Sequence, residues 1–501
     1  MNRTSLYWSV NLGFLCVLGL GSALGSAGSV HLVYLVLLFA ICATPILNVT
    51  AFNDRYALLA LFSLIFFQFY GTLDVITLFR GVGSVDGILS EAEAVILVGG
   101  AISQIGYRLM ARRSSSETGR AIGDWPEHTL LFAGCAMWVI ATYFSWQFKV
   151  NVLTETTAAA TQRGLASISG LQTIGYLLAV MVQPLSILIL AYLHTRYNRS
   201  YLAPLIIGVV LVQLVLGFVI DVKGEALIGA ILVAVTYLLV RGRIPKAWLV
   251  GIALFIALAF PAMQANRMIR SQYRIDHAEA AQNLLDTVKL AFSKSEEVTE
   301  GSNRSETVFE RLSLKGSVTM IVQRTGSEVP FQSGYTLTPI YAAFIPKIVW
   351  PNKPEVQTGQ LMNREFRVSA SAYTYISPSH LGEMYWNFSW PGVVIGTLLA
   401  SMLLGFIGKH VDMTHHQSIT RLMIAAVSIK YLIQGYEGTI AVAYVVWLRS
   451  MLAIGILHLL LSKRATAAGA ASDQQDGEPD PSGLQELVQS PPNHQLPNLL
   501  R

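Results

Sequence analysis

The sequence predicts an all-α polytopic integral membrane protein with about twelve transmembrane helices and one large loop between the ninth and tenth of them. The first observation behind this is composition: 53% of the 501 residues are hydrophobic and only 13% are charged, with a mean hydropathy of +0.50. One soluble core of this length cannot bury that much apolar surface. The second observation is that apolar segments with few charges follow one another along the chain, interrupted by one long polar stretch at about 265–390.

The apolar segments have the length that a membrane requires. A hydrocarbon layer about 30 Å thick takes roughly 20 apolar residues per helix, and such segments lie at 6–24, 29–48, 56–78, 88–109, 129–149, 169–193, 202–220, 225–241, 247–264, 391–409, 419–434 and 439–462. The fourth is the weakest of them, because Glu91 and Glu93 lie in its first turn and would also suit an interfacial helix. The chain therefore divides into membrane helices at 1–264, the polar loop at 265–390, further membrane helices at 391–462 and a tail at 463–501. The composition of that tail predicts disorder.

Lysines and arginines in the short loops predict the orientation. The dense basic clusters at 112–120, 194–199 and 241–246 and at the start of the tail all fall on one side if the N-terminus is cytoplasmic. Both termini are then cytoplasmic and the 265–390 loop is periplasmic, as expected for a multi-pass protein of the bacterial inner membrane. The net charge of +5 fits such loops and gives no nucleic-acid signal. The three cysteines lie in predicted spans, so neither a disulfide framework, a metal site nor a cofactor is expected.

Two groups of arginines in the polar loop are candidates for binding an anionic substrate. Arg267, Arg270 and Arg274 share one helical face where the ninth span leaves the bilayer. Arg364 and Arg367 share a face if their segment is helical. Guanidinium groups grip phosphate or pyrophosphate through paired hydrogen bonds. The alternative for the first group is anchoring to lipid headgroups.

A proline-rich turn follows an apolar run that is too short to span the membrane. Three prolines within 345–354 forbid a continuous helix and favour a rigid extended turn. The turn presents Trp350 between Lys347 and Lys353. An aromatic ring flanked by cations suits stacking on a sugar and holding a phosphate, although tryptophan is also a common interfacial anchor.

His380 and Glu383 are the candidate catalytic residues. Ser377-Pro378 has the composition of a helix start, with Ser377 as the N-cap and Pro378 in the first turn. Residues three apart project the same way one turn inside that start. The positive end of the helix dipole disfavours imidazolium, which would keep His380 neutral, as a general base must be. The alternative is a structural histidine with hydrogen-bonded ring nitrogens.

Two sequence elements resemble the Wzy-type polymerases. One is Pro346-Lys-Ile-Val-Trp350-Pro351-Asn-Lys353-Pro354, and the other is Gly382-Glu383-Met-Tyr385-Trp-Asn387-Phe388-Ser-Trp-Pro-Gly392. The resemblance implies a membrane enzyme that joins oligosaccharide repeat units carried on undecaprenyl diphosphate, without a metal. It implies a lipid-linked oligosaccharide and membrane lipid as partners, together with a flippase and a chain-length regulator of the same pathway. Tyr385 joins the substrate-binding candidates through the second element.

Departures from the family pattern leave alternatives open. A leucine at 381 and a displaced glycine distinguish the second element from the related O-antigen ligases. Lys223 occupies a short external turn where these families often carry an Arg-Gly pair, and it replaces the arginine only as a point charge. A polyprenyl-phosphate-sugar glycosyltransferase is disfavoured, because the first external loop holds no acidic residue. A lipid-linked-sugar transporter or flippase, with Asp74 among the residues lining a path, and a structural assembly partner remain alternatives.

Overall fold

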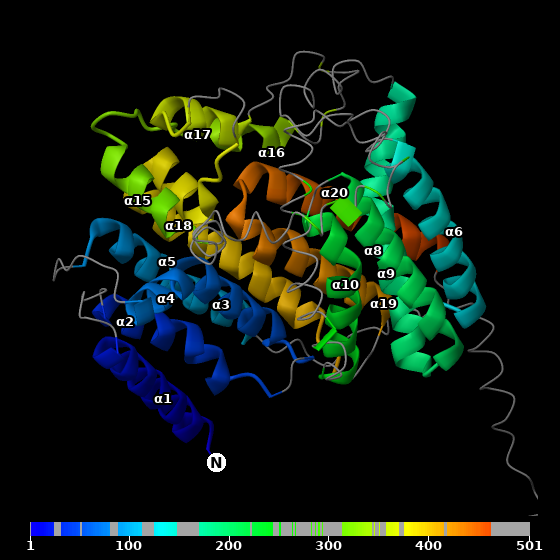
Figure 1. Cartoon of the computed structure of the whole chain (residues 1–501), viewed down its shortest axis with the longest axis horizontal. Coiled ribbons are helices and arrows are strands. Elements are labelled where there is room, and N and C mark those ends of the chain that lie inside the picture. Colours follow the sequence, from blue (N-terminus) through cyan, green and yellow to red (C-terminus); the bar gives the residue numbers. More distant parts are fainter. Residues whose placement is uncertain are drawn as a thin grey trace, which may run out of the picture.

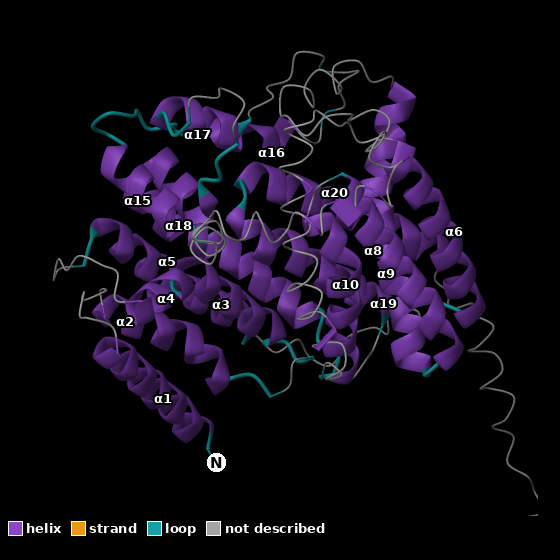
Figure 2. Cartoon of the chain, viewed as in Figure 1, coloured by secondary structure: helices purple, strands orange, loops and turns teal. Residues whose placement is uncertain are grey.

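A computed structural model describes eleven continuous stretches of the chain: 2–24, 32–50, 53–80, 89–112, 125–147, 170–220, 223–243, 313–342, 357–369, 375–414 and 418–461. Isolated residues between 250 and 293, together with Ile345 and Trp350, are also described. Within these stretches the chain is helical and contains no strand (Figure 2). The predicted all-α class is confirmed.

The helices fall into those before the polar stretch, those within it and those after it (Figure 1). The first group comprises α1 Arg3–Leu24, α2 Leu32–Ala43, η1 Thr44–Leu47, α3 Ala57–Tyr70, α4 Thr72–Arg80, α5 Glu91–Ala111, α6 Glu127–Trp146, α8 Gly170–Tyr197, η3 Ser200–Leu202, α9 Ala203–Val219 and α10 Lys223–Arg241. The second comprises α15 Lys315–Arg324, η4 Tyr335–Leu337, α16 Thr338–Ala342 and α17 Thr358–Phe366. The third comprises α18 Ser379–His410, α19 Ile419–Ser428, η5 Ile429–Ile433, η6 Gln434–Glu437 and α20 Ile440–Leu461.

Several described helices have the length and apolarity to cross a membrane. Six pass on their own, namely α1, α5, α6, α9 with its 3-10 turn, α18 and α20. The pair α3 and α4, bent by 48° at the break between them, makes a seventh if it counts as one span. Large apolar side chains also point outward, with Phe132 77% exposed and Leu459 78% exposed. Such surfaces suit lipid rather than water, so the chain has the architecture of a helical membrane protein.

The predicted spans coincide with helices wherever the structure describes them. The ninth, 247–264, lies almost wholly outside the described residues. The fourth is the helix α5, whose start is fixed by a capping box between Ser90 and Glu93. The Ser90 hydroxyl accepts from the Glu93 backbone, and the Glu93 carboxylate accepts from the Ser90 backbone, so two otherwise orphaned N–H groups are satisfied. The number of crossings stays a prediction.

Helices α5 and α18 lie against each other (Figure 1). Glycines make this possible. A Cβ at Gly405 of α18 would lie 2.4 Å from the Tyr107 carbonyl oxygen of α5, and one at Gly106 of α5 would lie 2.1 Å from Ser401 Oγ of α18. Lipid supplies no hydrophobic force between helices, so close backbone approach through small residues stabilises their contact.

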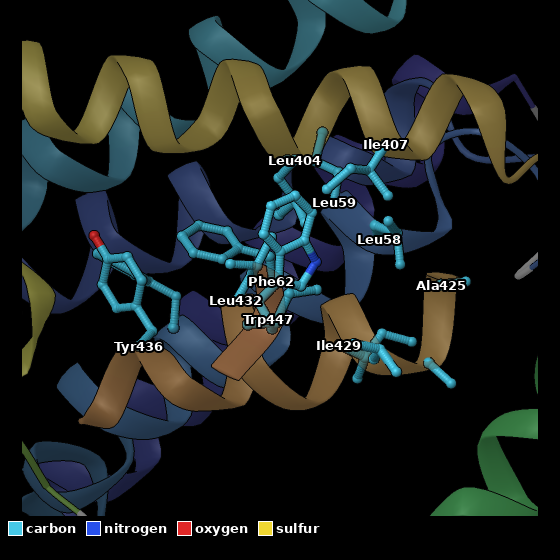
Figure 3. Close-up of a cluster of buried hydrophobic side chains, with 14 of the residues drawn as sticks. Leu58, Leu59, Phe62, Leu404, Ile407, Ala425, Ile429, Leu432, Tyr436 and Trp447 are labelled. Carbon is cyan, nitrogen blue, oxygen red and sulfur yellow. The ribbon is translucent and has the colours of Figure 1, made fainter. Parts of the chain in front are cut away.

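A second packing centre joins α3, α18 and the C-terminal helices. Figure 3 shows Leu58, Leu59 and Phe62 of α3 facing apolar side chains from the other elements. These come from α18, from α19 with η5 and η6, and from α20. Trp447 of α20 donates from Nε1 to Ser428 Oγ at 3.1 Å, which satisfies a buried indole N–H. Helices α18 and α20 are therefore held by a common core, and the first turn of α18 rests on it.

Candidate functional site

The first turn of α18 holds the candidate catalytic residues. The helix begins at Ser379, one residue after Pro378, so the cap lies slightly further along the chain than the sequence predicts. The Ser377 hydroxyl donates to the Glu437 carbonyl and accepts from the Ser379 N–H at 3.4 Å. The Ser379 hydroxyl accepts from the Gly382 N–H at 3.3 Å. Two serines therefore satisfy the helix start, and one of them ties it to η6.

His380 is buried against two tyrosines of the C-terminal segment. It is only 4% exposed. Its ring centroid lies 4.6 Å from that of Tyr436 and 5.8 Å from that of Tyr444. Among the described residues, its Nε2 has no hydrogen-bond partner. A buried imidazole nitrogen without a partner is uncommon, and such a group requires an explanation, which a bound water or substrate can supply.

A cavity inside the helix bundle reaches His380. It is lined by apolar side chains of α3 and α18 and by several hydroxyl groups, which belong to Ser103, Tyr107, Thr397, Ser401, Tyr436 and Tyr444. The cavity has a volume of about 20 Å³. This is room for about one water. A sugar ring does not fit.

Glu383 is fully buried, with 0% of its surface exposed. Its Oε2 accepts a hydrogen bond of 2.7 Å from the backbone N–H of Ile440, the first residue of α20. A carboxylate at a helix N-terminus meets the positive end of the helix dipole and an N–H that lacks a partner within the helix. Its Oε1 has no partner among the described residues. His380 and Glu383 therefore both face the segment 436–444, in agreement with their spacing.

The other polar residues of this element join α18 to its neighbours. The Tyr385 hydroxyl donates to Glu91 Oε1 at 2.9 Å, and Trp390 Nε1 donates to the same oxygen at 3.1 Å. Asn387 accepts from the Gly334 N–H at 2.8 Å. Asn387 Nδ2 donates to Thr336 Oγ1 and to the Glu383 carbonyl, each at 2.7 Å. The Tyr385 hydroxyl thus holds α5, and Asn387 holds the turn before α16.

Helix α18 is broken at Phe388 and Ser389, about one and a half turns after Glu383. Ser389 has φ 56° and ψ −146°, a conformation that side-chain-bearing residues rarely adopt. The break brings Met384 back against the following turn. A Cβ at Gly392 would lie 2.3 Å from the Met384 carbonyl oxygen, and one at Gly396 would lie 2.3 Å from Met384 Sδ. These glycines accommodate the break within α18.

Arg364 and Arg367, which were expected to share a helical face, do not both lie in helix α17. Arg364 lies in the last turn, exposed, and its nearest ion pair is with Glu365 at 3.1 Å. Helix α17 ends at Phe366, and Arg367 has left-handed backbone angles of φ 52° and ψ 47°. The shared helical face therefore stops before Arg367. The structure brings neither arginine into contact with His380 or Glu383.

Most other predicted binding residues lie outside the described part of the chain. These are Arg267, Arg270, Arg274, Lys347 and Lys353. Trp350 is described as a half-buried residue. Lys223 is the first residue of α10, and its side chain is outside the description. Their roles stay predictions.

The sequence did not predict one cluster of charged side chains, which the structure forms around Lys315. Lys315, the first residue of α15, pairs with Asp74 of α4 at 2.6 Å and with Glu93 of α5 at 2.8 Å. The sequence marks Asp74 and Glu93 as unusual acids near membrane segments. It offers no spacing that joins them to Lys315, because this lysine is 222 residues from Glu93.

Over the described stretches, no group of three or more His, Cys, Asp or Glu side chains is placed to hold a metal ion. Among the described residues, the buried polar atoms without a partner at the site include His380 Nε2, Glu383 Oε1 and the hydroxyls of Tyr436 and Thr439. They suit proton transfer and hydrogen bonding to a hydroxyl.

Comparison with known proteins gives one match. A family model described as a domain of unknown function, DUF8712, matches residues 145–464. The chain belongs to the DUF8712 family. No curated protein and no solved structure matches it. The matched region contains His380 and Glu383, whereas α3 and α5, which pack against α18, precede it.

Proposed function

We propose that this DUF8712 protein is a membrane glycan polymerase of the Wzy type. It would join undecaprenyl-diphosphate-linked oligosaccharide repeat units at the periplasmic face of the bacterial inner membrane. The observation that carries the proposal is the pair His380 and Glu383. Both are buried on the same side of the first turn of α18, and each has one polar atom without a partner among the described residues. The residues around them match the element that resembles the polymerases.

The proposed reaction uses the pair as follows. A hydroxyl of the acceptor unit attacks the anomeric carbon of the donor, forming a glycosidic C–O bond. The C–O bond to the diphosphate breaks, and undecaprenyl diphosphate leaves with the electron pair. His380 Nε2 takes the hydroxyl proton as general base. Glu383 Oε1 accepts a hydrogen bond from a second sugar hydroxyl, since Oε2 is held by Ile440.

The leaving diphosphate requires cations. The arginine groups at 267–274 and at 364–367 are the candidates for this role, because guanidinium binds phosphate oxygens in pairs. The exposed Arg364 side chain supports this assignment. Its ion pair with the neighbouring Glu365 is solvent-accessible, so replacing Glu365 with a phosphate would cost little free energy. The small cavity at His380 means that a sugar must approach from the outer end of α18 and displace part of its surroundings.

The test is polymerisation by purified protein in liposomes given lipid-linked repeat units. His380→Ala and Glu383→Gln should lower the rate about 10²–10⁴-fold, the usual effect of losing a general base, while short unpolymerised units accumulate. His410→Ala, at the exposed far end of α18, and Glu328→Gln, in an exposed pair with Arg324, are the matched controls. If only Glu383→Gln is inactive, the base is Glu383. Full activity in both variants would refute the site.

The same assay separates the related alternatives. An O-antigen ligase-like transferase would move one glycan to a different lipid acceptor and produce no ladder of chain lengths. A transporter or flippase for lipid-linked sugar would move the substrate across the bilayer without changing its length. The hydroxyl-lined cavity inside the bundle is the observation that favours transport. Against it, Asp74, a candidate path residue, is paired with Lys315.

A further inference from the structure

The charged cluster formed by Asp74, Glu93 and Lys315 joins three helices that come from distant parts of the chain. The Lys315 ammonium donates to Asp74 Oδ2 at 2.6 Å and to Glu93 Oε1 at 2.8 Å. It also lies 4.4 Å from the centre of the Tyr34 ring. The Lys315 side chain is 19% exposed, that of Asp74 16% and that of Glu93 1%. Glu93 is therefore shielded from water, and Lys315 and Asp74 are partly shielded. Opposite charges attract each other more strongly there than at a surface, and removing one partner leaves an uncompensated charge.

The position of each carboxylate follows from its place at the start of a helix. Glu93 uses its other oxygen, Oε2, to accept from the Ser90 N–H at 3.0 Å and from the Ser90 hydroxyl at 3.1 Å. Its position is thus fixed by the start of α5. Asp74 lies in the first turn of α4, where a carboxylate is favoured by the helix dipole. Lys315 therefore pairs with two carboxylates that each lie at the start of a helix, and these pairs hold the start of α15 beside α4 and α5.

Helix α15 connects this cluster to the candidate catalytic turn. Its buried face presses on α18 at Gly382, where a Cβ would lie 2.8 Å from Ile321 Cδ1 and 3.7 Å from Val318 Cγ2. Successive helical residues are about 100° apart around the axis. Gly382 therefore lies on a different side of α18 from His380 and Glu383. Helix α15 contacts the first turn of α18 on that side. Leu381, the residue before it, packs on Gly99 of α5.

The opposite end of α15 is also anchored. Arg324 Nη1 donates to the Phe366 carbonyl at 2.6 Å, at the end of α17. At the beginning of α15, the Leu314 N–H donates to the Phe69 carbonyl at 2.9 Å. Lys315 is the anchor that reaches both α4 and α5, and its loss would remove the ammonium group that pairs with both carboxylates.

We propose that Lys315 is a positioning residue: by pairing with Asp74 and Glu93 it holds α15 against the back of the first turn of α18, and so fixes His380 and Glu383. The part that concerns catalysis rests on the proposed function. The anchoring of α15 does not, and it can be measured without any substrate.

The experiment uses the full-length protein with its three native cysteines replaced by alanine. Val318→Cys places one thiol on the buried face of α15, where Val318 is 0% exposed. Gly316→Cys places a thiol on the exposed face of the same helix, with no neighbouring atom within 4 Å of its Cβ. Labelling with a water-soluble maleimide should be slow at Val318→Cys and fast at Gly316→Cys.

Adding Lys315→Met should raise the labelling rate of Val318→Cys about tenfold or more, because the helix is released from its paired anchor. Lys315→Arg keeps the charge and should restore slow labelling. Lys409→Met, at the other end of α18, should change nothing. An unchanged labelling rate in Lys315→Met overturns the proposal. If that variant fails to fold, Glu93→Gln serves instead, with a smaller increase expected and no increase overturning the proposal.

A catalytic readout completes the test. In liposomes, Lys315→Met should lower kcat about tenfold or more while KM stays within about twofold, and Lys315→Arg should recover most of kcat. Faster labelling with an unchanged kcat would overturn the positioning role. If the unsubstituted protein polymerises nothing, the proposed function fails, whereas the labelling rates still decide whether Lys315 anchors α15.

Discussion

The carboxylate of Glu383 accepts a 2.7 Å hydrogen bond from the backbone N–H of Ile440. This contact joins the first turn of α18 to the first turn of α20, 57 residues further along the chain. Glu383 therefore has two separable properties. One oxygen completes the start of a neighbouring helix, and the other has no hydrogen-bond partner among the described residues.

Substitutions at Glu383 should separate these properties. Glu383→Gln retains an oxygen that can accept from Ile440, so its melting temperature in detergent should stay close to that of the unsubstituted protein. Glu383→Ala leaves the buried N–H unpaired, which costs about 1–3 kcal/mol. Thermal unfolding followed by fluorescence measures both. Equal melting temperatures for the two variants would show that the contact contributes little to stability.

His380→Phe should preserve the fold. The imidazole packs against Tyr436 and Tyr444, and its Nε2 makes no hydrogen bond among the described residues. An aromatic ring of similar shape keeps the packing and removes a buried polar atom, so we expect a change within about 1 kcal/mol in stability. Polymerisation should nonetheless be lost. A strong fall in melting temperature would indicate a structural histidine.

Gly405→Leu should disrupt the contact between α5 and α18, because its Cβ alone would meet the Tyr107 carbonyl oxygen at 2.4 Å. We expect a loss of about 1–3 kcal/mol or more in stability, the usual cost of overpacking. Gly455→Leu on α20 is the matched control, since no atom lies within 4 Å of its Cβ. Comparable yields and melting temperatures for the two variants would contradict the close packing.

Ser389→Gly should stabilise the protein by about 1 kcal/mol, because glycine adopts φ 56° and ψ −146° without the steric cost that serine bears. Ser450→Gly, inside the regular helix α20, should instead destabilise by about 0.5–1 kcal/mol. Denaturation in detergent compares the two. Destabilisation by both glycines would mean that the break in α18 is absent in the membrane.

The orientation can be tested with single thiols in spheroplasts. Gly316→Cys lies in the segment predicted to be periplasmic, and Tyr201→Cys lies beside the basic cluster predicted to be cytoplasmic, where Tyr201 is 62% exposed. An impermeant maleimide should label the first directly and the second only after permeabilisation. The reverse pattern would overturn the predicted topology and with it the location of the site.

Local sequence signals were sufficient for the helices and for the shared side of His380 and Glu383. The apolar segments act over a few residues, so they can be read directly, whereas the helix cap expected at Ser377 lies at Pro378. The sequence did not predict where α17 ends. Arg367, directly after the helix, adopts a left-handed conformation that is usually signalled by a glycine, and this position is not a glycine. The break in α18 at Ser389 could not be predicted for the same reason, because Ser389 also has a positive φ without being a glycine. The pairing of Lys315 with Asp74 and Glu93 depends on tertiary contacts over more than 200 residues.

The close contact between α5 and α18 has a consequence for biosynthesis. Helix α5 ends at Ala111 and α18 begins at Ser379, so α5 leaves the ribosome long before its partner does. During that interval the face of α5 that carries Gly99 and Gly106 contacts lipid or other helices instead of α18. Contacts between distant parts of a chain form late and slowly. The candidate site is therefore completed only after α18 and α20 have been synthesised, and a nascent chain that ends before them would hold α5 without His380 and Glu383.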